Sequence, residues 1–125
     1  MKRGDKIFVY GTLRPGASNG RIMESGAKHV GSDTITGALL FDLGWFPGIK
    51  IINTDDIVVG DVYEIECDRL PSRLDAYEGF PNLYNREQVL TDNGEDVWVY
   101  TYNGQTKGHK IIENGDWLSH TTTEG

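Results

Sequence analysis

Cysteine is almost absent from this chain of 125 residues, which contains only Cys67. An intrachain disulfide is therefore impossible, and a reducing compartment suits such a chain best. The three histidines, His29, His109 and His120, show no zinc-ligand spacing, and only one thiol is available to join them. We expect no metal site, and we interpret Cys67 as a small buried hydrophobic residue.

Long apolar runs are also missing. Behind the charged start of the chain, the first apolar run covers only Ile7 to Val9. This run is too short for the core of a signal peptide and far too short for a membrane span. With the single cysteine, it predicts a cytoplasmic protein that has no membrane partner.

Positive charge is scarce, with 12 Lys and Arg against 19 Asp and Glu and a formal net charge of −7. Proteins that bind nucleic acids normally carry a basic patch or stripe. Here the basic residues are scattered, so we expect no nucleic-acid partner. The Gly-x-Ser-x-Gly motif is absent as well, which disfavours a serine hydrolase.

Glycine, in contrast, is abundant, and its 16 residues are roughly twice the usual share. This frequency indicates tight turns and short strands. The length fits one domain, and no repeat, heptad pattern or linker divides the chain. We therefore predict a single domain over residues 1–125, with a frayed polar end over residues 119–125.

Apolar and β-branched runs bounded by turn residues predict short strands over most of the chain. The predicted strands are Lys6 to Tyr10, Thr34 to Asp42 with an interruption at Gly37, Ile49 to Ile52, Ile57 to Glu66, Tyr84 to Thr91 and Asp96 to Tyr102. The last two form a hairpin about Asn93-Gly94. A short helical turn is expected around Arg21 to Ser25.

The clearest helix is predicted over Leu70 to Tyr77. Asp68 is a candidate cap, Pro71 suits the first turn and Gly79 supplies a stop. Many strands with one or two short helices indicate an α+β domain.

Two segments carry candidate chemistry. The strand that ends at Tyr10 runs into a glycine turn, whose backbone N–H groups can converge on an anion or a carbonyl oxygen. The ordinary alternative is a plain turn with Arg14 on the surface, because glycine turns are common.

The second segment places Glu78 at the end of the predicted helix. The helix dipole there disfavours a carboxylate, and the aromatic neighbours Tyr77 and Phe80 would desolvate it. Both effects raise the pKa of a carboxyl towards the range of a general acid/base. The alternative is a solvated Glu that closes a surface helix, with Asp75 either sharing its face or lying on the surface.

These segments and four others occur in an order that resembles the γ-glutamylcyclotransferase-like superfamily, which includes γ-glutamylamine cyclotransferases and AIG2-like proteins. The resemblance covers Lys6 to Trp117. The matching motifs are Tyr10-Gly11-Thr12-Leu13-Arg14, Phe46-Pro47-Gly48, Gly60-Asp61-Val62-Tyr63-Glu64-Ile65, Leu74-Asp75-Ala76-Tyr77-Glu78-Gly79, Tyr84-x-Arg86 and Asn114-Gly115-Asp116-Trp117.

The resemblance implies a small mixed β-barrel with short helices beside it. It implies an enzyme that cyclises a γ-glutamyl group to 5-oxoproline, with Glu78 as general acid/base and with no metal or other cofactor. Tyr10, Gly11, Thr12 and Leu13 would bind the substrate. Tyr84 would place its hydroxyl in the same pocket, unless it is a core aromatic.

Some further expectations concern single residues. Arg86 is expected to pair with a structural carboxylate, and Asp116-Trp117 to pack the end of the barrel. The short loop Arg14-Pro15-Gly16 argues against the glutathione-specific branch of the family.

The expected partner is a small γ-glutamyl molecule, while the leaving amine and the oligomeric state are left open. The alternative functions are a non-catalytic binding or interaction module with the same pocket, and a purely structural β domain.

Overall fold

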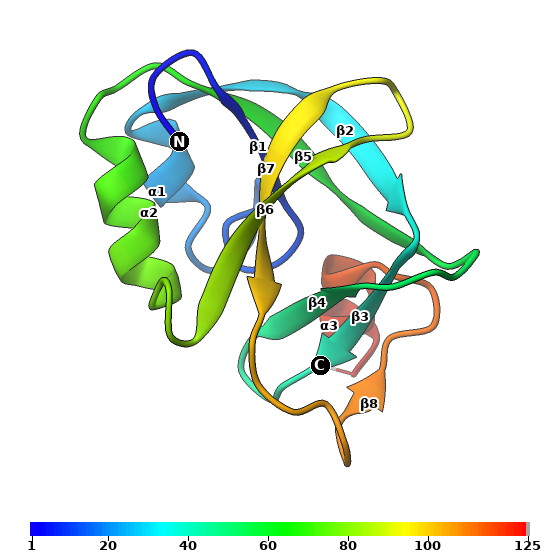
Figure 1. Ribbon diagram of the computed structural model, residues 1–125. Helices are drawn as coiled ribbons and strands as arrows, with labels where there is room; N and C mark the ends of the chain where they lie inside the picture. The colour runs from blue at the N-terminus through cyan, green and yellow to red at the C-terminus, as the bar shows by residue number, and fades with distance from the viewer. Residues whose placement is uncertain (125) are drawn as a thin grey trace.

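The structure of the protein is a computed structural model, which describes residues 1–124. Eight strands and three helices follow one another along these residues (Figure 1). They are β1 (Lys6–Val9), α1 (Arg21–Glu24), β2 (Ala27–Thr36), β3 (Ala38–Asp42), β4 (Pro47–Ile51), β5 (Ile57–Ile65), α2 (Leu70–Glu78), β6 (Tyr84–Leu90), β7 (Asp96–Tyr102), β8 (Lys110–Ile111) and α3 (Trp117–Glu124).

The strands form a five-stranded sheet in the order β2-β5-β1-β7-β6 and a three-stranded sheet in the order β4-β3-β8. In the larger sheet β1 is central, antiparallel to β5 and parallel to β7. The register places Phe8 opposite Val62 and Ile7 opposite Trp98. The predicted α+β class is confirmed, with both parallel and antiparallel pairs in one sheet.

The sheet is not closed into the barrel that the resemblance implied. Within residues 1–124, β2 and β6 remain the two edges of the larger sheet. Gly37, with a φ of 95°, separates β2 from β3 and turns the chain out of the larger sheet into the smaller one. Glycine adopts this left-handed conformation without the steric cost of a side chain.

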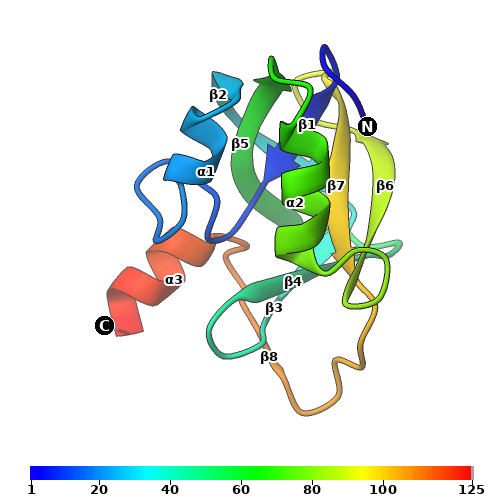
Figure 2. The ribbon, with the colours of Figure 1, turned by 90° about the vertical axis from the view of Figure 1, so that its left-hand side faces the viewer.

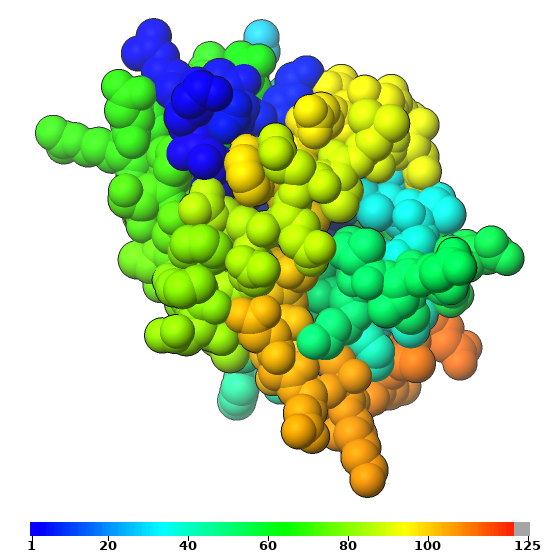
Figure 3. All heavy atoms as spheres, in the orientation of Figure 1, coloured from blue at the N-terminus to red at the C-terminus, as the bar shows by residue number. Residues whose placement is uncertain are grey.

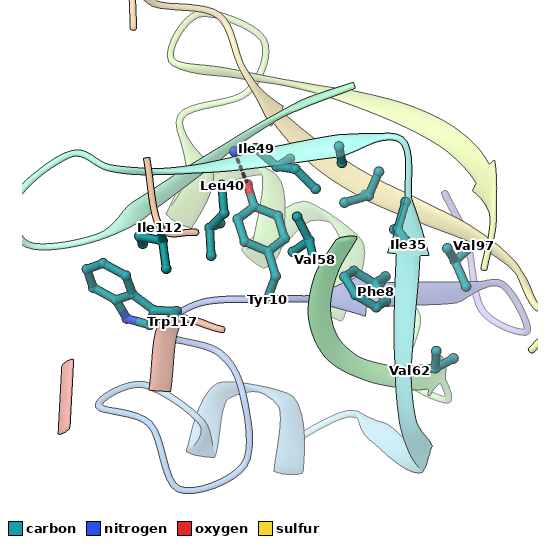
Figure 4. Packing of buried hydrophobic residues seen from close by; sticks show 12 residues of the cluster. Phe8, Tyr10, Ile35, Leu40, Ile49, Val58, Val62, Val97, Ile112 and Trp117 are labelled. Atoms are coloured by element: carbon teal, nitrogen blue, oxygen red, sulfur yellow. Dashed lines mark hydrogen bonds between the residues drawn. The ribbon is translucent and has the colours of Figure 1, made fainter. Parts of the chain in front are cut away.

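The five-stranded sheet lies between two apolar layers. Helices α1 and α2 lie side by side against one face (Figure 2). Buried side chains of this layer include Ile7 and Val9 of β1 and Leu74 of α2. Phe8 and Tyr10 alternate with them and enter the other layer (Figure 4). Because successive side chains of a strand point to opposite faces of the sheet, the end of β1 contributes residues to both layers.

That second layer is completed by the small sheet and helix α3. It contains buried residues of β3, β4 and β5, together with Trp117 at the start of α3. Trp117 is 5% exposed, as expected for a residue that packs one end of the sheet. Figure 3 shows the segment that follows β7, in orange, projecting from the lower end of the molecule.

Several boundaries differ from the sequence predictions. The predicted interruption at Gly37 is confirmed, because the chain is divided there into β2 and β3, and β2 begins at Ala27, well before the predicted Thr34. Helix α2 stops at Gly79 as predicted, with a φ of 66°. Its proposed cap Asp68 is wrong, because the cap is Arg69 and makes no side-chain hydrogen bond.

Residues 119–124 continue helix α3 in place of the expected frayed end. Asp116 precedes this helix, and its Oδ1 accepts a hydrogen bond of 3.2 Å from the Ser119 N–H. His120 Nε2 lies 2.8 Å from Asp42 Oδ2, which attaches the helix to the small sheet. Gly125 lies outside the described residues.

The helices are short throughout the described part of the chain. None of those within residues 1–124 has the length and apolarity that crossing a membrane would require.

Candidate active site

A cavity of about 260 Å³ lies where the end of β1, the starts of β4 and β6, and the end of α2 meet. Its lining is mostly aromatic and aliphatic, and Glu78 supplies the one acidic side chain among the lining residues. These are Phe8, Val9, Tyr10, Gly11, Thr12, Leu13, Phe46, Pro47, Tyr77, Glu78, Leu83, Tyr84 and Tyr100. All of the sequence-predicted site residues, from Tyr10 to Leu13 with Glu78 and Tyr84, are therefore brought together.

Glu78 is the last residue of α2 and projects into this cavity. Its carboxyl forms no hydrogen bond or ion pair with any other residue in the described part of the chain. Burial raises the pKa of the Glu78 carboxyl from 4.5 to about 7, because the charged form loses hydration that no partner replaces. At neutral pH this group can therefore both accept and donate a proton.

Residues 10–13, which the resemblance predicts to bind the substrate and which are called the substrate turn below, form another part of the cavity wall. Two backbone bonds shape it, from Arg14 N–H to Gly11 O at 3.1 Å and from Asn19 N–H to Thr12 O at 2.9 Å. The N–H groups of Gly11, Thr12 and Leu13 donate no hydrogen bond within residues 1–124. Three backbone donors are thus left for a ligand at the cavity.

Tyr10 contributes its backbone and ring to this wall, while its hydroxyl is used elsewhere. The hydroxyl donates a hydrogen bond of 2.7 Å to Tyr100 O and accepts one of 3.3 Å from the Ile49 N–H, which Figure 4 shows as a dashed line. Burial raises the pKa of the Tyr10 phenol, which stays protonated. The side chain therefore joins β1 to β7 and β4, the strands on both sides of the cavity.

Tyr84, at the start of β6, also lines the cavity. Its hydroxyl donates a hydrogen bond of 2.6 Å to Pro47 O. The ring is 3% exposed and contacts the Tyr102 ring edge-on. The hydroxyl thus holds β6 and β4 together at the cavity, and Tyr84 is a buried aromatic residue that also lines it.

Gly11 is required by close packing. A Cβ atom at this position would lie 2.6 Å from Pro47 Cγ and 2.9 Å from Pro47 Cδ. Atoms that are not bonded to each other do not approach so closely, so only glycine fits between the turn and Pro47.

Sequence reasoning missed other lining residues. Tyr77 is one of them, and its hydroxyl lies 2.6 Å from Thr12 Oγ1 and accepts a hydrogen bond of 2.8 Å from Asn19 Nδ2. The sequence signal that could have identified Tyr77 as a lining residue is its position next to Glu78. Tyr100 carried no such signal, because it comes from β7 and reaches the cavity only through strand pairing.

Asp75 lies behind the cavity wall. It accepts a hydrogen bond of 2.6 Å from the Tyr100 hydroxyl, and its Oδ1 is 3.2 Å from Arg86 Nε. The expectation that Arg86 pairs with a structural carboxylate is confirmed. The Arg86 guanidinium also stacks over Phe80, 4.2 Å from the ring centroid. Asp75 therefore fixes α2 against β6 and β7 one turn before Glu78.

Arg14 is not the surface residue of the ordinary alternative. It is 8% exposed and forms ion pairs with Asp61 and Asp116. A buried charge of this kind is retained only where it is paired, which indicates a specific role for the side chain.

No three His, Cys, Asp or Glu side chains within residues 1–124 cluster in a way that could hold a metal ion. The cavity itself presents the Glu78 carboxyl and the backbone N–H groups of residues 11–13.

Comparison with known proteins finds one matching family model and several similar proteins. The family model described as "Gamma-glutamyl cyclotransferase, AIG2-like" matches residues 7–119. YtfP of Escherichia coli, named as a gamma-glutamylcyclotransferase family protein, is 36% identical over 113 residues, covering 90% of this chain and 96% of its own length. Its solution structure superposes with a TM-score of 0.72, covering 93% of this chain and 98% of that one.

Two other proteins are similar. PH0828 of Pyrococcus horikoshii, whose crystal structure is described as that of an uncharacterized protein, gives a TM-score of 0.78 at 26% identity, covering 96% of this chain and 95% of that one. A relative from Niallia circulans is named "Gamma-L-glutamyl-butirosin B gamma-glutamyl cyclotransferase". It is 32% identical over 106 residues, 78% of this chain and 66% of that protein. The chain therefore belongs to the AIG2-like γ-glutamyl cyclotransferase family.

Proposed function

We propose that this protein converts a γ-glutamyl amine or γ-glutamyl amino compound into 5-oxoproline and the free amine, with Glu78 as the general acid/base. One observation carries the proposal. The unpaired Glu78 carboxyl, with a pKa of about 7, lies in the same cavity as the unbonded N–H groups of residues 11–13.

The reaction needs no nucleophile from the protein, because a γ-glutamyl amide carries its own. The substrate α-amine attacks the γ-carbonyl carbon, a five-membered lactam closes, and the bond from that carbon to the leaving nitrogen breaks. Well-oriented groups within one molecule react with effective molarities on the order of 10⁵ M or more. The task of the cavity is therefore to hold the substrate in its folded conformer.

Protons must move from the attacking nitrogen to the departing nitrogen. The α-amine is largely protonated at neutral pH, so it releases one proton to solvent before it attacks and a second as the lactam N–H forms. Glu78 in its carboxylate form accepts a proton from that nitrogen and then donates one to the departing amine. A carboxyl with a pKa of about 7 suits both steps, since both protonation states are populated near neutral pH.

Negative charge develops on the γ-carbonyl oxygen when the amine attacks. Backbone N–H groups aimed at such an oxygen stabilise it without reorganisation. Gly11, Thr12 and Leu13 supply donors at the cavity, and the same turn is suited to bind the substrate carboxylate. The aromatic walls exclude water, which strengthens these interactions.

The relatives support this choice of substrate class. The Niallia circulans protein is named for a γ-glutamyl conjugate of butirosin B, and the matched family is named for γ-glutamyl cyclotransfer. We propose a small γ-glutamyl compound as the partner of this chain. A cytoplasmic location agrees with its single cysteine.

The direct test is to incubate the purified protein with γ-glutamyl-ε-lysine, γ-glutamyl-alanine and glutathione, and to detect 5-oxoproline by mass spectrometry. Production from one or more of them supports the proposal, and the preferred compound identifies the leaving group. A folded protein that binds 5-oxoproline in calorimetry but turns over none of the compounds would instead favour a binding module.

A further inference from the structure

We propose that Arg14 is a positioning residue, which fixes the backbone of the substrate turn through ion pairs with Asp61 and Asp116. Arg14 lies outside the cavity lining, so it acts through the turn rather than on the substrate. The inference rests on the function proposed above, because it assigns the turn the task of binding substrate oxygens.

The guanidinium joins three distant parts of the chain. Arg14 Nε donates a hydrogen bond of 2.9 Å to Asp61 Oδ2, on β5, and Nη1 donates one of 2.9 Å to Asp116 Oδ1, in front of α3. These partners lie 47 and 102 residues further along the sequence. The residue that directly follows Leu13 is thus tied to both the large sheet and the C-terminal helix.

The anchor on β5 is itself fixed. Asp61 is 4% exposed, and its second oxygen, Oδ1, lies 2.9 Å from His29 Nε2 and accepts a hydrogen bond of 3.3 Å from Ser32 Oγ. Both oxygens of this carboxylate are therefore engaged, and its orientation is determined by β2 as well as by Arg14. A carboxylate held in this way provides a rigid attachment point.

Arginine is the residue that suits this geometry. Its planar guanidinium donates from separate nitrogens in fixed directions and stays charged, whereas the ammonium of lysine is a single point charge. Removing it would take the arginine partner from two carboxylates, and the buried Asp61 would keep only the contacts of its Oδ1 with His29 and Ser32.

The substrate turn needs such an anchor because its own donors do not hold it. The N–H groups of Gly11, Thr12 and Leu13 have no acceptor within residues 1–124. Their direction therefore depends on the bonds to Gly11 O and Thr12 O, on the Thr12 side chain and on the residues at both ends of the turn. The hydroxyl of Tyr10 fixes one end, and the side chain of Arg14 fixes the other.

The experiment compares Arg14→Met and Asp116→Asn with Glu95→Gln. The first removes both ion pairs, and the second removes one and retains a side chain that caps helices well. The control breaks the ion pair of Lys6 Nζ with Glu95 Oε2, which involves no cavity residue. The readouts are kcat/KM, the inhibition constant of 5-oxoproline, and amide order parameters from NMR.

For Arg14→Met we expect kcat/KM to fall about 100-fold, because displacing a reacting group by about 1 Å costs that much. The inhibition constant of 5-oxoproline should rise, while the pH at which activity is half-maximal, set by Glu78, should not move. Asp116→Asn should show a smaller change in the same direction, and Glu95→Gln none. The amide order parameters of residues 11–13 should fall below about 0.6 in Arg14→Met.

Folded variants with unchanged kcat/KM and an ordered turn would overturn the inference. If Arg14→Met does not fold, Asp116→Asn decides in the same way. If the wild-type protein turns over no γ-glutamyl compound, the proposed function fails by itself. The amide order parameters of residues 11–13 in Arg14→Met then still test the anchoring role. Unchanged order parameters overturn that role, and lowered ones support it.

Discussion

The hydroxyl of Tyr77 lies 2.6 Å from Oγ1 of Thr12. This contact joins helix α2, whose next residue is Glu78, directly to the substrate turn. Asn19 adds a second bond to the same hydroxyl, from its Nδ2 at 2.8 Å. The carboxyl and the backbone donors that the mechanism requires are therefore held at a fixed separation by one exposed phenol.

Tyr77→Phe should lower activity more than it lowers the stability of the fold. The ring is 39% exposed, so loss of its hydrogen bonds should cost about 1 kcal/mol of unfolding free energy or less. We expect kcat/KM to fall about 10-fold, the equivalent of 1.4 kcal/mol. Kinetics of Thr12→Val and of the double variant complete a mutant cycle. Strictly additive losses would show that the two hydroxyls are not coupled.

Gly11→Ala should damage the site through packing. The added methyl group would lie 2.6 Å from Pro47 Cγ, which forces the turn away from β4. Overpacking of this kind costs about 1–3 kcal/mol, and we expect both thermal stability and turnover to fall. The matched control is Gly31→Ala, since a Cβ there would have no neighbour within 4 Å. Equal behaviour of both variants in thermal melts and assays would refute the packing argument.

Tyr84→Phe tests what the buried hydroxyl does. In the free protein it donates to Pro47 O, and its removal leaves that carbonyl unpaired at a cost of about 1–3 kcal/mol. We expect a lower midpoint in urea and a raised KM, because β4 and β6 both line the cavity. A raised KM at unchanged stability would instead indicate that the hydroxyl leaves Pro47 and binds the substrate itself.

The Glu78 carboxyl should also make stability depend on pH. Its pKa is about 7 in the folded protein and 4.5 without burial, so between these values the folded state binds the proton and the unfolded state does not. Stability from this group is complete below pH 4.5 and is lost as the pH rises through 7. The loss is of order 3 kcal/mol.

Glu78→Gln should therefore be more stable than the wild type at pH 8 and nearly equal to it at pH 4. Urea unfolding across this range measures the difference, with Glu87→Gln on the exposed face of β6 as the control. A Glu78→Gln difference that does not change with pH would mean that the carboxyl is not desolvated.

Much of the fold followed from local signals. The sequence predicted the strand at Lys6, the stop at Gly79 and the hairpin of β6 and β7. These features depend on turn residues and on alternating apolar side chains, which lie close together in the sequence. The parallel pairing of Ile7 with Trp98 was not predictable, since nothing near either residue specifies its partner. The interruption at Gly37 was predicted, but the passage of the chain there into a second sheet was not, since the strand pattern does not specify pairing partners.

The site also contains residues that the sequence predicted and residues that only the fold reveals. Glu78 and the substrate turn were found through motifs, and the structure brings them together around one cavity. The ion pairs of Arg14 were not predicted, because its partners, Asp61 and Asp116, are far away in sequence. Long-range ion pairs leave no periodic pattern, so only the fold reveals them.

The central claim is that Glu78 transfers the protons of a γ-glutamyl cyclisation, and turnover of the preferred substrate by Glu78→Gln tests it most directly. The amide keeps the shape of the side chain but does not act as a base. We expect 5-oxoproline production to fall at least 100-fold, a typical contribution of general acid/base catalysis. The variant should remain folded and should bind 5-oxoproline in calorimetry. Production at the wild-type rate by Glu78→Gln would contradict the mechanism.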